Sequence, residues 1–187
     1  MPTSSKPTKT FITRLLILTH HITSRKKLHA VTLFSNSCSL LIKSGKPPGI
    51  FLCEFSSPNP PSSSSPSSSS SSPSYSTPSP VTPIDSHRED AERWLEKMRR
   101  LRYKDFRVAL REELVLEPGD SSQRLARIVP KGEVMEVREN LKEFAGLVDS
   151  CDEVDHVNVK GRVRTGAKLD RETLGAWWRR GMGWAKE

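Results

Sequence analysis

A tract of serine and proline divides the chain and limits what the chain can fold into. Residues 56–80 contain fifteen serines and seven prolines, and the other three residues are asparagine, tyrosine and threonine. Such a stretch has almost no apolar surface to offset the loss of chain entropy on folding, so we expect it to be disordered. We therefore divide the chain into a disordered N-terminus at 1–10, two halves of one domain at 11–55 and 84–148, a disordered insertion at 56–83, and a polar loop with an aromatic C-terminal helix at 149–187.

Charge is distributed unevenly along the chain. Residues 1–83 carry eight lysines and arginines and a single acid, Glu54, whereas residues 84–187 carry 22 basic and 21 acidic residues. The formal net charge of +8 therefore comes almost entirely from the N-terminal part. That part suits contact with a polyanion, and it suits equally a small sheet unit whose few exposed side chains are basic.

Hydrophobic spacing on both sides of the tract predicts strands and helices in turn. An apolar run over 11–22 indicates a first strand, and Thr23 or Ser24 is a suitable N-cap for a helix after it. We further expect a strand at 50–55 entered through a turn at 45–49, a helix at 87–101, a strand at 106–110, a helix at 130–148 and an aromatic segment at 174–184. The order strand, helix, strand, long loop, helix, strand predicts a small α+β sandwich with its helices on one sheet face.

Several classes of function find little support in the residues. Cys38, Cys53 and Cys151 are far apart and form no CxxC pair, which favours buried thiols in a reducing compartment over a disulfide frame or a zinc site. The longest nearly uncharged apolar run, residues 15–18, is far shorter than the roughly 20 residues of a membrane span, so we expect no membrane association. No Ser/His/Asp or Cys/His spacing indicates catalysis, and we expect neither an enzyme nor a cofactor.

The first thirty residues raise a question of compartment. They are basic, rich in hydroxyl groups and free of acids, which is also the composition of a mitochondrial transit peptide. A transit helix would place several arginines on one face, however, and only Arg14 lies in the apolar run. We therefore expect a nuclear or cytoplasmic protein and keep a mitochondrial protein of unknown role as an alternative.

Four stretches, taken in order, resemble a known domain. They are Leu-Thr-His-His-Ile at 18–22, Ser-Arg-Lys-Lys at 24–27, Gly-Lys-Pro-Pro-Gly-Ile-Phe-Leu-Cys-Glu at 45–54, and Trp94-Leu95 with Arg99-Arg100-Leu101-Arg102. This set resembles the C-terminal domain of the spliceosomal pre-mRNA-processing factor three family, which is also found behind RWD domains in RWD-domain-containing proteins. The similarity covers about residues 11–113, with the Ser/Pro tract where the family has a short loop.

Two departures from the family pattern accompany the resemblance. After Lys27 the chain has Leu-His-Ala-Val at 28–31 in place of the tryptophan-alanine core that the family usually shows. Met1 lies only ten residues before the first expected strand, with no room there for an RWD domain. We therefore expect either a truncated member or a chain that begins inside a longer one.

The resemblance implies a ferredoxin-like fold, a split βαβ sandwich, and binding to small nuclear RNA or to a ribonucleoprotein subunit. The residues expected to contact RNA are basic or histidine side chains near the ends of the expected elements: His20, His21, Arg25, Lys26, Lys27, Lys46, Arg99, Arg100 and Arg102. A protein–protein adaptor without RNA contact, in which the tract is a flexible spacer, remains the alternative.

These side chains also have ordinary structural explanations. His20 and His21 would point to opposite faces of a strand, so we expect that they cannot chelate one ion together. The cations at 25–27 stand at a helix start, where free amides favour an anion, although a solvated loop explains them too. The arginines at 99–102 complement a helix dipole, and the tryptophans at 177–178 suit a core better than a base-stacking surface.

Overall fold

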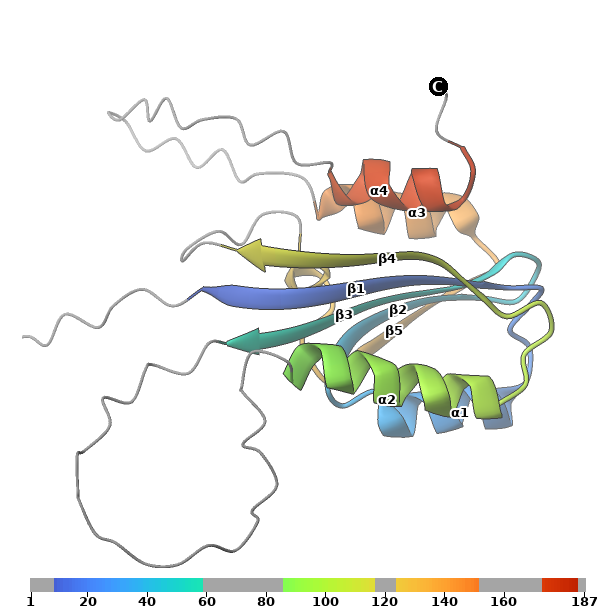
Figure 1. Ribbon diagram of the computed structural model, residues 1–187. Helices are drawn as coiled ribbons and strands as arrows, with labels where there is room; N and C mark the ends of the chain where they lie inside the picture. The colour runs from blue at the N-terminus through green and yellow to red at the C-terminus, as the bar shows by residue number, and fades with distance from the viewer. Residues whose placement is uncertain (1–8, 59–85, 117–123, 152–172, 185–187) are drawn as a thin grey trace, which may run out of the picture.

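The computed structural model describes residues 9–58, 86–116, 124–151 and 173–184. The elements in chain order are β1 (Thr10–Thr19), α1 (Arg25–Phe34), β2 (Cys38–Ser44), β3 (Gly49–Pro58), α2 (Ser86–Arg100), β4 (Arg107–Leu116), the short 3-10 helix η2 (Leu125–Arg127), β5 (Val134–Arg138), α3 (Leu141–Ser150) and α4 (Leu174–Gly181). They form an α+β fold in which a five-stranded mixed sheet lies between two layers of helices (Figure 1). We call the face under α1 and α2 the first face, and the face under α3 and α4 the second face.

The sheet is built around β1, and its strand order is β4-β1-β3-β2-β5. β1 pairs antiparallel with both β3 and β4, so that Leu16 lies opposite Leu52 on one side and Leu110 on the other. β2 pairs antiparallel with β3, and β5 joins the outer edge of β2 in parallel. Helices cover both faces, which explains why β1 is buried continuously from residue 12 to residue 19 and shows no polar alternation.

The core of the first face is organised around Trp94, which is only 2% exposed. Its ring makes edge-to-face contacts with Phe34, Phe51 and Phe55. Its indole nitrogen donates to the hydroxyl oxygen of Ser35 at 3.0 Å, so the one polar atom of the side chain is satisfied in the core. The expectation that 87–101 is a helix with Trp94 on its buried stripe is confirmed by α2.

The first helix begins where the sequence predicts. Ser24 is the N-cap of α1, and its hydroxyl oxygen accepts from the amide of Lys27 at 3.5 Å. Leu28 and Val31 face the sheet and are buried. The local signals, a capping serine followed by apolar residues at helical spacing, were therefore sufficient for this element.

On the second face, the aromatic tail packs against the sheet. Trp177 and Trp178 of α4 are each 1% exposed, which confirms that they belong to the core. Gly181 allows this close approach, because a Cβ atom at that position would lie 2.4 Å from a methyl carbon of Leu16. The expectation that all helices share one sheet face is wrong, since α3 and α4 cover the second face (Figure 1).

The helix expected at 130–148 is wrong in its first half. Residues 134–138 form β5, with Val134 opposite Leu40 and Val137 opposite Lys43 of β2. The chain then turns through Glu139, whose φ is +59°, and the helical part begins only at α3. A three-residue spacing of apolar side chains suits either conformation over so short a stretch, and here pairing with β2 decides between them.

The boundary of the Ser/Pro tract also moves. Its first three residues, 56–58, belong to β3, where Ser57 lies opposite Phe11 of β1. The hydroxyl of Ser86, at the start of α2, donates to the hydroxyl oxygen of Ser57 at 2.8 Å.

The predicted element order also lacked β2, which precedes β3. The disorder expected for the N-terminus and for the rest of the insertion falls on 1–8 and 59–83, outside the described residues, whereas Thr10 already belongs to β1. Most of the segment expected as a polar loop, at 152–172, also lies outside the described residues.

The three cysteines are buried, as expected, and carry free thiols. Cys38 and Cys53 lie on the first face, and burial raises the pKa of the Cys38 thiol to about 12. Cys151 lies in the core of the second face. The thiolate that metal binding or disulfide exchange requires is therefore disfavoured at Cys38.

Replacement of Trp94 by alanine should lower the free energy of unfolding by about 3–5 kcal/mol, the usual cost of removing a large buried aromatic side chain. Trp184, which is 49% exposed, provides a control of the same residue type. Its replacement by alanine should cost less than about 1 kcal/mol. Urea unfolding followed by circular dichroism measures both, and equal losses in the two variants would contradict the assigned core.

Candidate functional site

The residues expected to contact RNA all lie at one end of the sheet, on the right in Figure 1. This end is formed by the β1–α1 loop, the β2–β3 turn and the connector between α2 and β4, and we call residues 20–27, 45–49 and 99–107 the basic end. Backbone hydrogen bonds hold its parts together. The amide of His20 donates to the carbonyl of Lys104 at 2.9 Å, and the amide of Gly45 donates to the carbonyl of Ile22 at 2.9 Å.

Strand geometry predicted that His20 and His21 would point to opposite faces, but in the structure their side chains lie together. β1 ends at Thr19, so the alternation of side chains no longer applies at the next two residues. The Nδ1 atoms of His20 and His21 lie 2.6 Å apart, and the rings meet edge to face. At that distance the ring nitrogen of one histidine donates a hydrogen bond to that of the other, with the direction set by the tautomers. Among the described residues no group of three or more histidine, cysteine or acidic side chains is arranged to hold a metal ion.

Three of the expected cations have partners within the protein. The guanidinium of Arg25 pairs with Glu136 at 3.1 Å, and that of Arg100 pairs with Glu96. The ammonium of Lys27 donates to the carbonyl of Arg102 at 3.0 Å, which ties the first turn of α1 to the connector after α2. These groups contribute to the shape of the basic end as well as to its charge.

The other expected cations are exposed and have no ion-pair partner in the part of the chain that the structure describes: Lys26, Lys46, Arg99 and Arg102. Lys104 and Arg107, on the connector and at the start of β4, share this property. Arg107 and the neighbouring Asp105 were missed by the sequence analysis, which included only Arg102 from the connector among the expected contacts. A polar run directly after the basic end of a helix was the one signal that pointed to them.

Backbone strain is also concentrated here. Among the described residues other than glycine, three have positive φ values: Arg102 at 50°, Asp105 at 56° and Glu139 at 59°. Two of them lie in the connector, and the amide of Glu139 donates to the carbonyl of Ser44, at the end of β2. Side chains with a Cβ rarely adopt this conformation, and such positions often occur at functional sites.

A buried lysine positions the β2–β3 turn. Lys43 is 1% exposed, and its ammonium donates to the carbonyls of Lys46 and, at 2.9 Å, Pro48. Burial lowers the pKa of the Lys43 amine, and the nearby Glu139 carboxylate opposes this effect. Because the amine holds the carbonyl of Lys46, it fixes the turn that carries the exposed Lys46 side chain.

Tyr103 anchors the connector to the first-face core. It is 8% exposed, and its ring lies edge to face with that of Phe51, with the centroids 5.4 Å apart. The ammonium of Lys27 lies 5.0 Å from the ring centroid, which is the arrangement of a cation–π contact. The hydroxyl oxygen of Tyr103 is buried without a hydrogen-bond partner among the described residues, and burial raises the pKa of this phenol to about 12.

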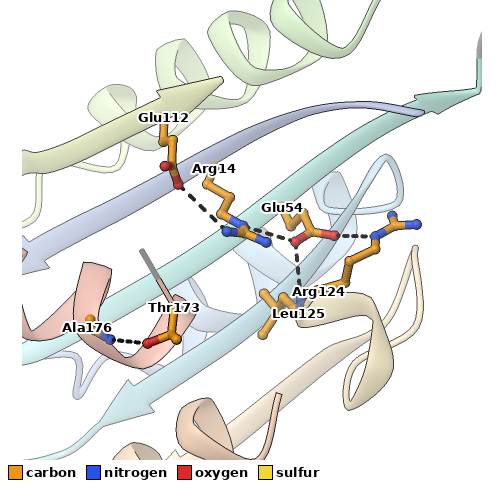
Figure 2. A network of polar contacts seen from close by, with 7 residues as sticks. All are labelled: Arg14, Glu54, Glu112, Arg124, Leu125, Thr173 and Ala176. Atoms are coloured by element: carbon orange, nitrogen blue, oxygen red, sulfur yellow. Dashed lines mark hydrogen bonds and ion pairs between the residues drawn. The ribbon is translucent and has the colours of Figure 1, made fainter. Parts of the chain in front are cut away.

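A second cluster of charges lies on the second face, midway along the ladder between β1 and β3 (Figure 2). Arg14 and Glu54, each 1% exposed, form an ion pair in which Nε of Arg14 lies 3.2 Å from the carboxylate. The same carboxylate accepts from Nε of Arg124 and from the amide of Leu125, both at 3.1 Å. Glu112 approaches Arg14 at 3.6 Å from β4. Because the Glu54 carboxylate is saturated by groups of the protein, it offers no site for a ligand.

No family model matches the chain, and no curated protein or solved structure matches it. The family resemblance stated for residues 11–113 therefore rests on the residues of this chain alone. Within the described residues, no helix is long and apolar enough to cross a membrane.

Replacement of Glu54 by glutamine should destabilise the protein by about 3 kcal/mol, because it leaves two buried or half-buried guanidinium groups with a neutral acceptor. Glu92→Gln is the control, since Glu92 forms an exposed ion pair with Arg111 that is worth at most about 1 kcal/mol. Chemical unfolding of the two variants measures both losses of stability. A loss below that of the control would show that the cluster does not hold the second helical layer.

Replacement of Tyr103 by phenylalanine should leave stability at neutral pH unchanged or slightly raised, because the hydroxyl is buried without a partner. The folded-state pKa is raised, so the stabilisation from the neutral phenol is present below about pH 10 and is lost as the pH rises toward 12. The variant should therefore gain on the parent by roughly 1 kcal/mol at pH 11. Parallel loss of stability in both proteins between pH 9 and 12 would contradict this.

Proposed function

We propose that this chain is a non-enzymatic RNA-binding domain whose basic end holds the phosphates of single-stranded RNA. The observation that supports it best is a group of exposed cations without ion-pair partners in the described residues, gathered at one end of the sheet: Lys26, Lys46, Arg99, Arg102, Lys104 and Arg107. Such cations can neutralise phosphates without first breaking an internal ion pair.

In helix α2, the ion pairing of the arginines differs between the body of the helix and its C-terminal end. Arg88, Arg93 and Arg100 of α2 pair with glutamate or aspartate side chains, whereas Arg99 and the connector after it carry the unpaired charges. Ion pairing over most of the helix leaves its surface nearly neutral. Positive charge that is uncompensated at only one end of the helix favours contact with a polyanion at that end. If the charge served only solubility, it would not need to be concentrated there.

The start of α1 adds a second favourable group. Its first turn contains no acidic residue, and its first residues carry the side chains of Arg25 and Lys26 beside the free amides of the helix terminus. The positive end of the helix dipole favours a phosphate at this position. The sheet faces are both covered by helices, so we expect contacts to the RNA backbone and loop side chains, with no base-stacking platform on the sheet.

We further propose that β1, α1, β2, β3, α2 and β4 form a ferredoxin-like unit related to the C-terminal domain of the spliceosomal pre-mRNA-processing factor three family. The strand order β4-β1-β3-β2, with neighbouring strands antiparallel, supports this wiring. Most of the stretches that carry the resemblance meet at the basic end, which supports a shared binding function. Such a role suits a nuclear or cytoplasmic protein.

The experiment compares the parent with a variant in which Lys26, Lys46 and Arg99 are replaced by glutamine. Binding of a short single-stranded RNA is followed by fluorescence anisotropy at several salt concentrations. The variant should bind more weakly, about equally for different sequences. The slope of log affinity against log salt should fall by about 0.7 for each phosphate that the variant no longer neutralises.

A matched control removes three positive charges at the opposite end of the sheet by replacing Arg88, Arg127 and Lys131 with glutamine. These side chains contact Glu113, the carbonyl of Cys151 and the carbonyl of Ser56, respectively. The control should retain most of the affinity and the salt slope of the parent. Equal weakening in both variants would show that net charge alone accounts for binding and would contradict a site at the basic end. If the parent does not bind RNA, a protein–protein adaptor is the better interpretation.

A further inference from the structure

β4 forms one edge of the sheet, and its outer side has no neighbouring strand among the described residues (Figure 1). Within that part of the chain, residues 107–111 and 113–114 make no backbone hydrogen bond outside their ladder with β1. Five of the ten residues of β4 are exposed, whereas β1 beside it is buried continuously from residue 12 to residue 19. The free amides and carbonyls along an edge of this length can pair with another strand.

The two edges of the sheet differ in exposure. The described residues include four exposed large apolar side chains, and two of them, Val108 and Val115, belong to β4. β5, at the other edge, is only five residues long, and four of these are buried or half-buried. Added strands gain the most hydrogen bonds and apolar contact at the longer and more exposed edge, which is β4.

The sequence of β4 is chemically symmetrical about Glu112. Three apolar residues at 108–110 precede Arg-Glu-Glu at 111–113, and three apolar residues at 114–116 follow. When two copies of β4 lie antiparallel with their Glu112 residues opposite each other, Arg111 of each copy faces Glu113 of the other. Leu110 faces Leu114 in the same way. Opposite charges and apolar pairs across two strands both stabilise a ladder.

The faces of the sheet agree with this pairing. Arg111 forms an ion pair with Glu92 of α2, and Glu113 forms one with Arg88 of α2, so both side chains lie on the first face. Leu110 packs against the core of the second face. Residues opposite each other in an antiparallel pair share a face. The charged pairs of two copies would therefore form on the first face, beside α2.

Neighbouring registers lack these pairs. With Arg111 or Glu113 at the two-fold axis, that residue faces its own copy and no arginine faces a glutamate. With Glu112 at the axis two carboxylates also face each other, but each lies 3.6 Å from the Arg14 guanidinium of its own chain, which offsets their repulsion. Beyond Leu110 the ladder with β1 changes register, so the regular part of β4 is the part that carries the symmetry.

We propose that two copies of this chain pair through β4, antiparallel about a two-fold axis at Glu112, and join their sheets into one continuous sheet. The chemical symmetry of β4 favours a second copy over an unrelated strand, which would require no symmetry in β4 itself. A two-fold contact of this kind closes on itself, so assembly ends at the dimer. The inference goes beyond RNA binding and does not depend on it.

The test is sedimentation equilibrium of the full chain at up to about 100 µM, because one strand edge buries less area than a standard interface and gives a weak dimer. The parent should dimerise. Arg111→Glu and Glu113→Arg each place like charges opposite one another twice, and each variant alone should dimerise at least about tenfold more weakly. An equimolar mixture should recover the association of the parent within about threefold, because both cross-strand pairs are then of opposite charge.

Arg100→Glu and Glu96→Arg provide matched controls, since they reverse the same charges in an exposed ion pair on α2. Each control should dimerise like the parent, and circular dichroism checks that all the variants are folded. A parent that stays monomeric would overturn the proposal. Dimerisation of Arg111→Glu and Glu113→Arg at the strength of the parent would overturn the assignment to β4, and a mixture no stronger than either variant alone would overturn the register.

Discussion

The ion pair between Arg14 and Glu54 determines where the second helical layer can attach to the sheet. Both side chains come from the two central strands and both are 1% exposed, so each requires a partner that stays in place. Glu54 obtains two of its partners, Arg124 and the amide of Leu125, from the chain that follows β4. A charge in the first part of the sequence therefore fixes the docking point of a segment about seventy residues later. The chain then adds β5 to the edge of the sheet and places α3 and α4 on its second face.

Covering both faces of the sheet has a consequence for function. A sheet with one open face can present side chains to a ligand over a broad surface, but here both faces are occupied by helix packing. Loops at the ends of the strands remain, and loops fixed on a rigid scaffold are common positions for binding residues. At the basic end the loops are held by backbone hydrogen bonds, by the Lys27–Arg102 contact and by the buried Lys43 amine. The strained residues Arg102 and Asp105 lie within this framework.

The sequence predicted those elements whose signals are local. A capping serine and helical spacing were enough for α1, and the stripe around Trp94 was enough for α2. β5 was missed because its spacing of apolar residues fits a helix as well, and only a long-range pairing with β2 distinguishes the two. For the candidate site, the cations at 25–27 and 99–102 were proposed from the family resemblance and from their charge. The orientation of the two histidines depends on where β1 ends, and the place of Asp105 and Arg107 depends on how the connector folds back, which no local pattern encodes.

The contact between the hydroxyls of Ser57 and Ser86 means that β3 ends where α2 begins, although 28 residues separate the two serines in the chain. The strands on either side of this junction are interleaved: β4, from after the junction, pairs along its length with β1, from before it. α2 packs on the same core as α1. Proteolytic cleavage anywhere between residues 59 and 85 would therefore produce two fragments that stay associated through a complete strand ladder and a shared core. The chain is, in this sense, a natural starting point for a split protein whose halves reassemble.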